Sequence, residues 1–154
     1  MFAPFRIQRP LSKAQRAALP STRSPDSYAE RLLKLVPAEA IALYLAGRGV
    51  ITGSPDPVAG LDPQSALLGW GILGLVIVVA LRWWGTADRK LGESPQIGAV
   101  IVSAISYLVW IYSLGDSFKD YGVHDPKLGG LLVIVWTFVV PFIYRGSRDD
   151  VSVI

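Results

Sequence analysis

The sequence predicts an all-α integral membrane protein with four transmembrane helices and with both chain ends on the cytoplasmic side. The 154 residues are 51% hydrophobic and only 18% charged, whereas a soluble domain has about 25% charged residues. The charges gather in short stretches between long apolar runs. Lysine and arginine are also distributed unequally between the two sides that these runs define. We therefore expect the chain to be embedded in lipid.

Three apolar runs, 65–81, 96–115 and 128–144, contain no charged residue. Each is close to the length that crosses about 30 Å of hydrocarbon. A fourth run, 32–51, carries charged residues and is a weaker span by hydropathy, but we still expect it to cross the membrane. Together the runs predict a membrane domain over residues 25–154, with spans at about 32–51, 64–84, 95–115 and 126–144.

A residue that can cap a helix, followed by proline, precedes each strong run. These pairs are Asp62-Pro63, Ser94-Pro95 and Asp125-Pro126, and Ser24-Pro25 stands before the weaker run in the same way. A side-chain oxygen at this position accepts a hydrogen bond from a free helix amide, while proline suits the first helical position because no donor is needed there. The pattern indicates that all four runs are helices.

The distribution of basic residues predicts the orientation. With the N-terminus inside, the inner face carries seven Lys and Arg from residues 1–34, three from 82–95 and two from the tail, against three on the outer face. This imbalance predicts a multi-pass protein of the cytoplasmic (inner) membrane. The N-terminal end lacks the apolar core of a secretory signal, but its arginine-rich, acid-free composition leaves a mitochondrial inner membrane as a minor alternative.

Residues 1–24 form a basic segment without a single acidic residue. We expect it to be a cytoplasmic arm that contacts anionic lipid headgroups or an acidic partner, and we expect no nucleic-acid binding. Its basic residues are Arg6, Arg9, Lys13, Arg16 and Arg23.

Glu39 is the strongest candidate for a functional residue, because it lies inside the weaker run. A carboxylate at the centre of a transmembrane helix costs about 2.5–3.5 kcal/mol, so it is expected to be protonated, paired, or turned toward a polar cavity or a neighbouring subunit. By depth, Arg82 is the first candidate for an ion-pair partner and Arg145 the second.

Pro37 leaves two geometries open for the first span. Either one helix continues through it with a kink and an unpaired carbonyl at Leu33, or Pro37 begins a new helix in which Glu39 caps free amides. In the second case residues 28–36 form a separate amphipathic helix on the membrane surface. The remaining span would then be short and would need tilted partners or a thinner bilayer.

The third run carries polar residues at helical spacing, namely Ser103, Ser106 and Tyr107. Small residues and hydroxyl groups let helices approach closely and form hydrogen bonds in lipid. We interpret these three residues as a helix-packing face rather than as a conduction path.

Nothing in the sequence predicts a metal site, a cofactor or an enzyme. There is no cysteine and only one histidine, His124, and the spacing of His124 and Asp125 with Asp116 and Asp120 matches no cation site that we recognise. A membrane hydrolase or transferase needs grouped nucleophiles, bases or metal-binding acids, and the runs bring no such group together.

The sequence Ala38-Glu39-Ala40-Ile41-Ala42 resembles the stretch around the proton-binding glutamate of the small multidrug exporters. The resemblance covers only these residues, and it would imply proton-coupled export. The chain departs from that family at Pro37, in its long basic N-terminal segment, and in the lack of a matching aromatic group in the third run. We therefore assign no family from it.

These observations lead to two expected functions. The first is a non-enzymatic structural, anchoring or assembly subunit of a membrane complex that self-associates or joins a larger assembly. The alternative is an oligomeric ion or proton channel, or a proton-coupled carrier of a small solute, that uses Glu39.

Overall fold

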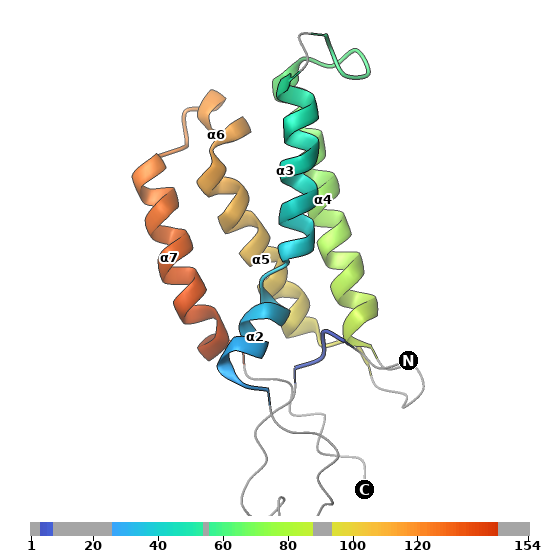
Figure 1. The fold of residues 1–154 in the computed structure, drawn as a ribbon, viewed down its shortest axis with the longest axis vertical. Coiled ribbons are helices and arrows are strands. Elements are labelled where there is room, and N and C mark those ends of the chain that lie inside the picture. The colour runs from blue at the N-terminus through green and yellow to red at the C-terminus, as the bar shows by residue number, and fades with distance from the viewer. Residues whose placement is uncertain (1–3, 8–25, 54–55, 88–93, 145–154) are drawn as a thin grey trace, which may run out of the picture.

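The computed structural model describes residues 4–7, 26–53, 56–87 and 94–144. In this part of the chain all regular structure is helical, and an isolated bridge between Val58 and Leu61 is the only β-type pairing. The prediction of an all-helical fold is therefore confirmed. The helices are α2 (Tyr28–Leu35), α3 (Ala38–Gly53), α4 (Pro63–Thr86), α5 (Ile97–Leu114), α6 (Asp116–Asp120) and α7 (Pro126–Ile143), as labelled in Figure 1.

Two of the predicted helix caps are present. Asp62 accepts hydrogen bonds from the amide (3.0 Å) and the hydroxyl group (2.7 Å) of Ser65 at the start of α4. Asp125 accepts from the amides of Lys127 (2.8 Å) and Leu128 (3.2 Å) at the start of α7. In both helices proline follows the cap.

The other two caps differ from the sequence prediction. Helix α5 begins after Gln96 and not after Ser94, and no side chain caps it. Ser24 lies outside the described residues, and α2 is capped by Ser27, which forms a reciprocal capping box with Glu30. Ser27 is favoured because it has Glu at the third helical position, where the carboxylate can reach back to the Ser27 amide at 2.6 Å.

The predicted first span, 32–51, is not one helix. Helix α2 ends at Leu35, α3 begins at Ala38, and the two are bent by 42°. Pro37 explains the break, since it has no amide donor and its ring would collide with the preceding turn. The amide of Val36 closes α2 by donating to Leu32 (2.9 Å), and Pro37 accepts the first bonds of α3 from Ala40 and Ile41. The break into two helices agrees with the second geometry considered for Pro37, although Glu39, expected there to cap free amides, pairs with Arg82.

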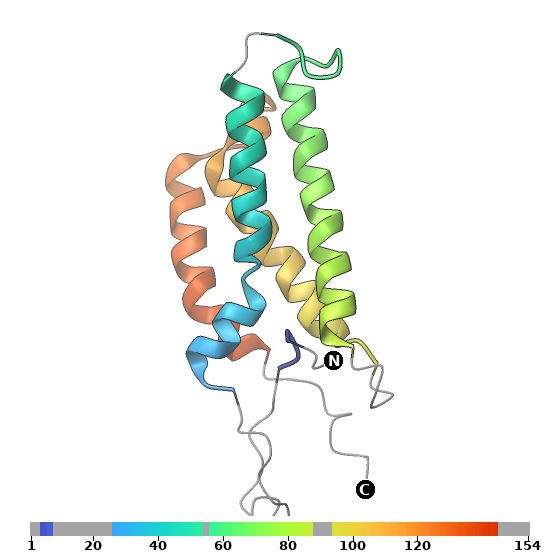
Figure 2. The ribbon, with the colours of Figure 1, turned by 45° about the vertical axis from the view of Figure 1, so that its right-hand side comes forward.

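The long helices lie side by side as a bundle in which α5 is central. Helix α4 packs against both α3 and α5, and α7 packs on α5. Figures 1 and 2 show α3 and α4 as neighbours along their length, with α2 at the lower end of the bundle and α6 at the upper end. The two views also place residues 4–7 and the last turns of α4 and α7 at the lower end.

Three helices, α4, α5 and α7, are long and apolar enough to cross a membrane by length and composition. The bent pair of α2 and α3 also passes this test when it is taken as one span, which makes up to four candidates. Large apolar side chains of α4 and α7 are exposed, among them Val76 (58%) and Phe138 (68%). Apolar surface of this extent suits a helix that faces lipid and would be unfavourable in water.

Candidate functional site

A buried ion pair connects the start of α3 with the last turns of α4. Glu39 lies in the first turn of α3, where the helix dipole favours a negative charge. Its Oε1 atom is 2.9 Å from Nη2 of Arg82, whose side chain is 1% exposed while that of Glu39 is 41% exposed. The structure thus brings together the carboxylate and the first of its two candidate partners.

The guanidinium group of Arg82 has few hydrogen-bond acceptors around it. Its contact with Glu39 is an ion pair that lacks hydrogen-bond alignment, and Nε, Nη1 and Nη2 have no hydrogen-bond partner among the described residues. The aromatic ring of Phe5 lies over the group, with its centroid 4.0 Å from the central carbon. A cation over an aromatic face is attracted by the ring quadrupole, most strongly where water is excluded.

Phe5 belongs to residues 4–7, which we call the N-terminal strap because they bind across the end of the bundle. The amide of Phe5 donates to the carbonyl of Gly85 at 3.2 Å. A Cβ atom on Gly85 would collide with the Phe5 ring. Glycine at this position therefore lets the strap approach the α4 backbone closely.

Arg6 and Ile7 complete the docking of the strap. Nη1 of Arg6 donates to the carbonyls of Thr86 and Ser94, both at 3.1 Å. The side-chain amide of Gln96 bonds both backbone groups of Ile7, accepting from its N–H at 2.9 Å and donating to its carbonyl at 3.2 Å. Ile7 is fully buried, and it packs in a cluster with Leu35, Ala99, Val102 and Val140.

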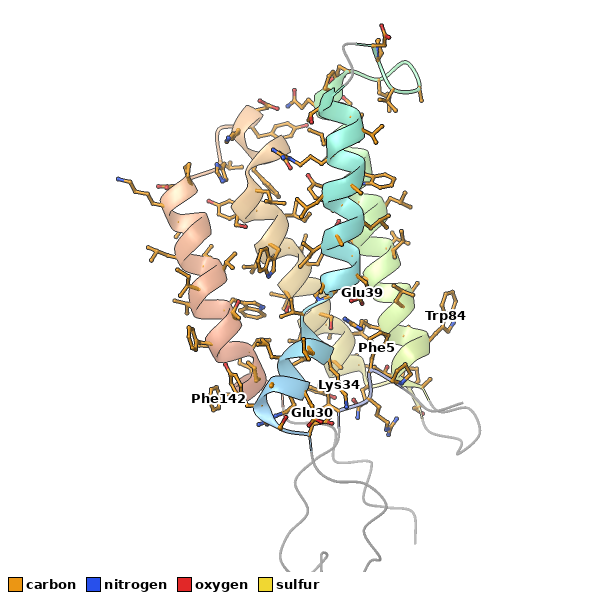
Figure 3. The ribbon with its side chains drawn as sticks, in the orientation of Figure 1. Phe5, Glu30, Lys34, Glu39, Trp84 and Phe142 are labelled. Atoms are coloured by element: carbon orange, nitrogen blue, oxygen red, sulfur yellow. The ribbon has the colours of Figure 1, made fainter. Side chains whose placement is uncertain are left out.

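Helix α2 holds the strap from its other side. Nζ of Lys34 donates to the Arg6 carbonyl at 2.9 Å and pairs with the Asp26 carboxylate at 2.6 Å. Figure 3 shows Glu39 near the junction of α2 and α3, with Phe5 and Lys34 at the same end of the bundle. Trp84 points away from the helices in the same view. The strap, α3 and α4 therefore meet around Arg82, and α2 contacts the strap through Lys34.

A second polar cluster lies at the opposite end of the bundle. The carboxylate of Asp116 accepts from the Tyr44 hydroxyl at 2.8 Å and pairs with Nε of Arg48 at 2.7 Å. Its side chain is only 5% exposed. Asp116 thereby fastens α6 to α3, a pairing that the sequence does not reveal because the residues lie about 70 positions apart.

The predicted packing face of α5 joins two neighbouring helices. Ser103, Ser106 and Tyr107 are all fully buried. The Tyr107 hydroxyl donates to the Gly71 carbonyl of α4 at 3.2 Å, and the Trp136 indole of α7 donates to Ser106 at 2.8 Å. The Ser103 hydroxyl has no hydrogen-bond partner in the described part of the chain.

Of the basic residues assigned to the N-terminal arm, the structure describes only Arg6. Arg6 is 7% exposed and donates to two carbonyls of the bundle, so in the structure it is part of the docked strap. Its contact with lipid or a partner stays a prediction. The remaining residues lie outside the described residues, as does the second candidate partner of Glu39; they are Arg9, Lys13, Arg16, Arg23 and Arg145.

The described residues contain no group of three or more His, Asp or Glu side chains that could hold a metal ion. His124 instead packs against the ring of Tyr112, with centroids 5.5 Å apart. The Arg82 site can hold an ion pair between Arg82 and Glu39 next to the Phe5 ring of the strap, and Glu39 can leave that pair for another cation.

No protein-family model, no curated protein and no solved structure matches this chain.

Proposed function

We propose that the protein is a non-enzymatic structural or assembly subunit of the cytoplasmic membrane, with four spans and both ends in the cytoplasm. The observation that carries the proposal is the use of charged side chains on the helices. Glu39 with Arg82, and Asp116 with Arg48, form pairs between different helices of the same chain. Such pairs hold helices of the same chain together. Because each carboxylate is paired with an arginine, neither is left over to bind a solute or ion.

The hydroxyl and indole groups of the bundle support the same proposal. Tyr107, Trp136 and Trp70 donate to neighbouring helices, the last through its indole to the Tyr44 carbonyl at 3.2 Å. Hydrogen bonds between helices are a main source of helix association in lipid, where the hydrophobic effect is missing. Polar groups used in this way join helices and do not line a path for a solute.

The outward faces of α4 and α7 are the surfaces through which a subunit of this kind would meet lipid or other helices. Their large exposed side chains are apolar, and α7 packs against α5 and α2. We propose that the chain self-associates or joins a larger complex through such faces, with anionic headgroups around its basic end.

One end of the bundle has the features expected of the cytoplasmic side in the proposed orientation. The strap, the ends of α4 and α7 and the start of α2 all lie at one end of the bundle. The exposed indoles of Trp83 and Trp84 (46% and 64%) are at the same end, a position typical of the membrane interface. Twelve of the 15 basic residues belong to the segments of the sequence at or next to these helix ends, which supports the placement of this end on the cytoplasmic side.

A channel or proton-coupled carrier remains the second candidate, and one observation favours it. The first candidate span is broken, and Glu39 at the break has a side chain that is 41% exposed. Broken helices with ionisable groups at the break form the binding sites of many transporters. Glu39 would be the proton-binding or ion-binding group in that case.

Flux measurements on liposomes distinguish the two functions. We expect wild-type protein to give proton and potassium flux no greater than protein-free liposomes, and native mass measurement in detergent to show more than one copy. Asp120→Asn serves as a control, since Asp120 is an exposed acid at the far end of the bundle. Flux that is present in wild type and in Asp120→Asn but lost in Glu39→Gln, with the copy number retained, would establish the carrier instead.

The topology has its own test, because the chain contains no cysteine. We expect a single cysteine at Tyr121, which is 61% exposed, to react with an impermeant maleimide added outside intact cells. A cysteine at Trp84 should react only after the cells are opened. The reverse pattern would refute the proposed orientation.

A further inference from the structure

Arg82 is the point at which three separate parts of the chain meet. Its guanidinium group contacts the Glu39 carboxylate at the start of α3 and the Phe5 ring of the N-terminal strap, while its own backbone lies in α4. The contact with Glu39 supplies the only opposite charge within 4.0 Å of Arg82 in the described part of the chain. The state of Glu39 therefore decides whether the buried cation beneath Phe5 is compensated.

A buried cation that loses its partner is strongly unfavourable, and it moves toward water if it can. The Arg82 guanidinium forms no hydrogen bond to any described residue that would stand in for the carboxylate. The Phe5 ring covers one face of the guanidinium group at 4.0 Å. Hydration of this face requires the ring to leave.

Most contacts of the strap are confined to the end of the bundle. The Phe5 amide donates to Gly85, the Arg6 guanidinium donates to Thr86 and Ser94, and the Ile7 backbone bonds to the Gln96 side chain. Lys34 of α2 donates to the Arg6 carbonyl, and the Phe5 ring and the buried Ile7 side chain pack on the bundle. Detachment of the strap leaves the hydrogen bonds within each helix in place and frees only the Gly85 and Thr86 carbonyls at the end of α4, which the strap otherwise binds. The strap can therefore detach as a local unit while the helices stay packed.

We propose that Glu39 controls the N-terminal strap through Arg82, so that the strap is docked while the Glu39–Arg82 pair is formed and is released when Glu39 no longer neutralises Arg82. The pair and the strap then act as a charge-operated latch at this end of the bundle. Because the Glu39 side chain is 41% exposed, a cationic group from outside the bundle can draw it away from Arg82. This is the event that Glu39→Gln imitates.

The test uses the full-length chain in lipid nanodiscs and a single cysteine in place of Ile7, which is 0% exposed. The rate of reaction with a soluble maleimide reports the fraction of time for which the strap is released. We expect Glu39→Gln to raise this rate at least about tenfold, given the size of the penalty for an unpaired buried charge. In an Arg82→Met background, the same substitution should have no further effect.

Two controls separate the latch from general loosening. A cysteine at Ile111, a buried residue of α5 in a different cluster from Ile7, should keep its slow rate in Glu39→Gln. Asp120→Asn removes an acid far from Arg82 and should leave the Ile7 cysteine unchanged. The proposal fails if Glu39→Gln does not raise the rate, if its effect persists undiminished with Arg82→Met, or if Ile111 becomes reactive in parallel.

Limited digestion with trypsin provides a second measurement that needs no cysteine. Cleavage after Arg6, which is 7% exposed and bound to two carbonyls, requires the strap to leave the bundle. We expect the fragment that begins with Ile7 to form faster in Glu39→Gln than in the chain with native Glu39 or in Asp120→Asn. Equal rates in all three proteins would contradict the proposal even if the Ile7 cysteine altered docking.

Discussion

The hydroxyl group of Tyr28 donates to the carbonyl oxygen of Phe138 at 3.1 Å and also lies 3.4 Å from the carbonyl oxygen of Thr137. Thr137 is four residues before Pro141, which lies inside α7 and has no amide hydrogen to offer. Tyr28, on α2, thus reaches a backbone acceptor that proline has left open in another helix. A free carbonyl in lipid needs such a partner.

This contact predicts a dependence between Tyr28 and Pro141. We expect Tyr28→Phe to lower the free energy of unfolding by about 1 kcal/mol, the usual net value of a hydrogen bond. In a Pro141→Ala background the amide of Ala at this position can donate to the Thr137 carbonyl within α7. The loss of unfolding free energy caused by Tyr28→Phe should then become smaller. Circular dichroism during reversible unfolding in mixed micelles measures both values, and equal losses in the two backgrounds would show that Tyr28 does not compensate for the proline.

Asp116 is expected to stabilise the end of the bundle opposite the strap. Asp116→Ala would leave the Tyr44 hydroxyl and Arg48 without the acceptor that they share. Since hydrogen bonds to charged groups contribute about 1.5–3 kcal/mol, we expect a loss of about 2 kcal/mol in the free energy of unfolding. Asp120→Ala on the same short helix is the matched control and should change it by less than about 0.5 kcal/mol. A similar effect of both substitutions would mean that the Asp116 contacts add nothing.

Gly74 is expected to be essential for the contact between α4 and α5. A Cβ atom at this position would overlap the hydroxyl group of Tyr107, which donates to Gly71. Gly69 is on the same helix and has open space around it. We expect Gly74→Ala to be less stable than Gly69→Ala by about 1–3 kcal/mol, the usual cost of overpacking, in the same unfolding assay. Equal stability of the two variants would show that the helices can separate freely here.

The cap of α4 predicts a pH dependence. Hydrogen bonds from the Ser65 backbone amide, and then from its hydroxyl, hold the pKa of Asp62 below its usual value. A carboxylate with a lowered folded-state pKa stabilises the fold above its unfolded-state pKa, and this contribution is lost as the pH falls through the folded-state value.

Wild-type protein should therefore be more stable than Asp62→Ala at pH 7, and the difference should shrink below about pH 4, near the pKa of an unperturbed aspartate. Unfolding measured over a series of pH values checks this. A difference that stays constant down to strongly acidic pH would rule out the cap as its source.

The helices follow from local signals, and for this reason they are predictable. Long apolar runs and the Asp-Pro pairs at 62–63 and 125–126 locate α4 and α7, because a cap and its helix are neighbours in sequence. Pro37 indicates that the helix is interrupted, but it does not decide between a kink in one helix and a break into two helices, because the same sequence is compatible with both. The cap of α5 was predicted wrongly, because Gln96 and the strap rearrange the start of that helix.

Part of the candidate site is predictable as well. Glu39 and Arg82 can be matched from the sequence, because in a four-span arrangement the start of the first run and the end of the second lie at the same depth, and the structure pairs the two residues. Phe5, Gln96 and Gly85 cannot be found in this way, because their contacts join residues about 80–90 positions apart and follow no periodic pattern. The sequence gives no sign that Arg6, among the arginines of residues 1–24, binds the bundle. Its position follows from the packing of its neighbours Phe5 and Ile7.

The docking of the strap also sets an order of events during synthesis. Phe5, Arg6 and Ile7 are among the first residues made, but Ile7 binds Gln96, 89 positions later in the chain. At about 5–20 residues per second, translation takes roughly 4–18 seconds to cover that interval. The strap therefore cannot dock until α4 and the start of α5 have been made, and its attachment marks a late stage in the maturation of the newly made chain.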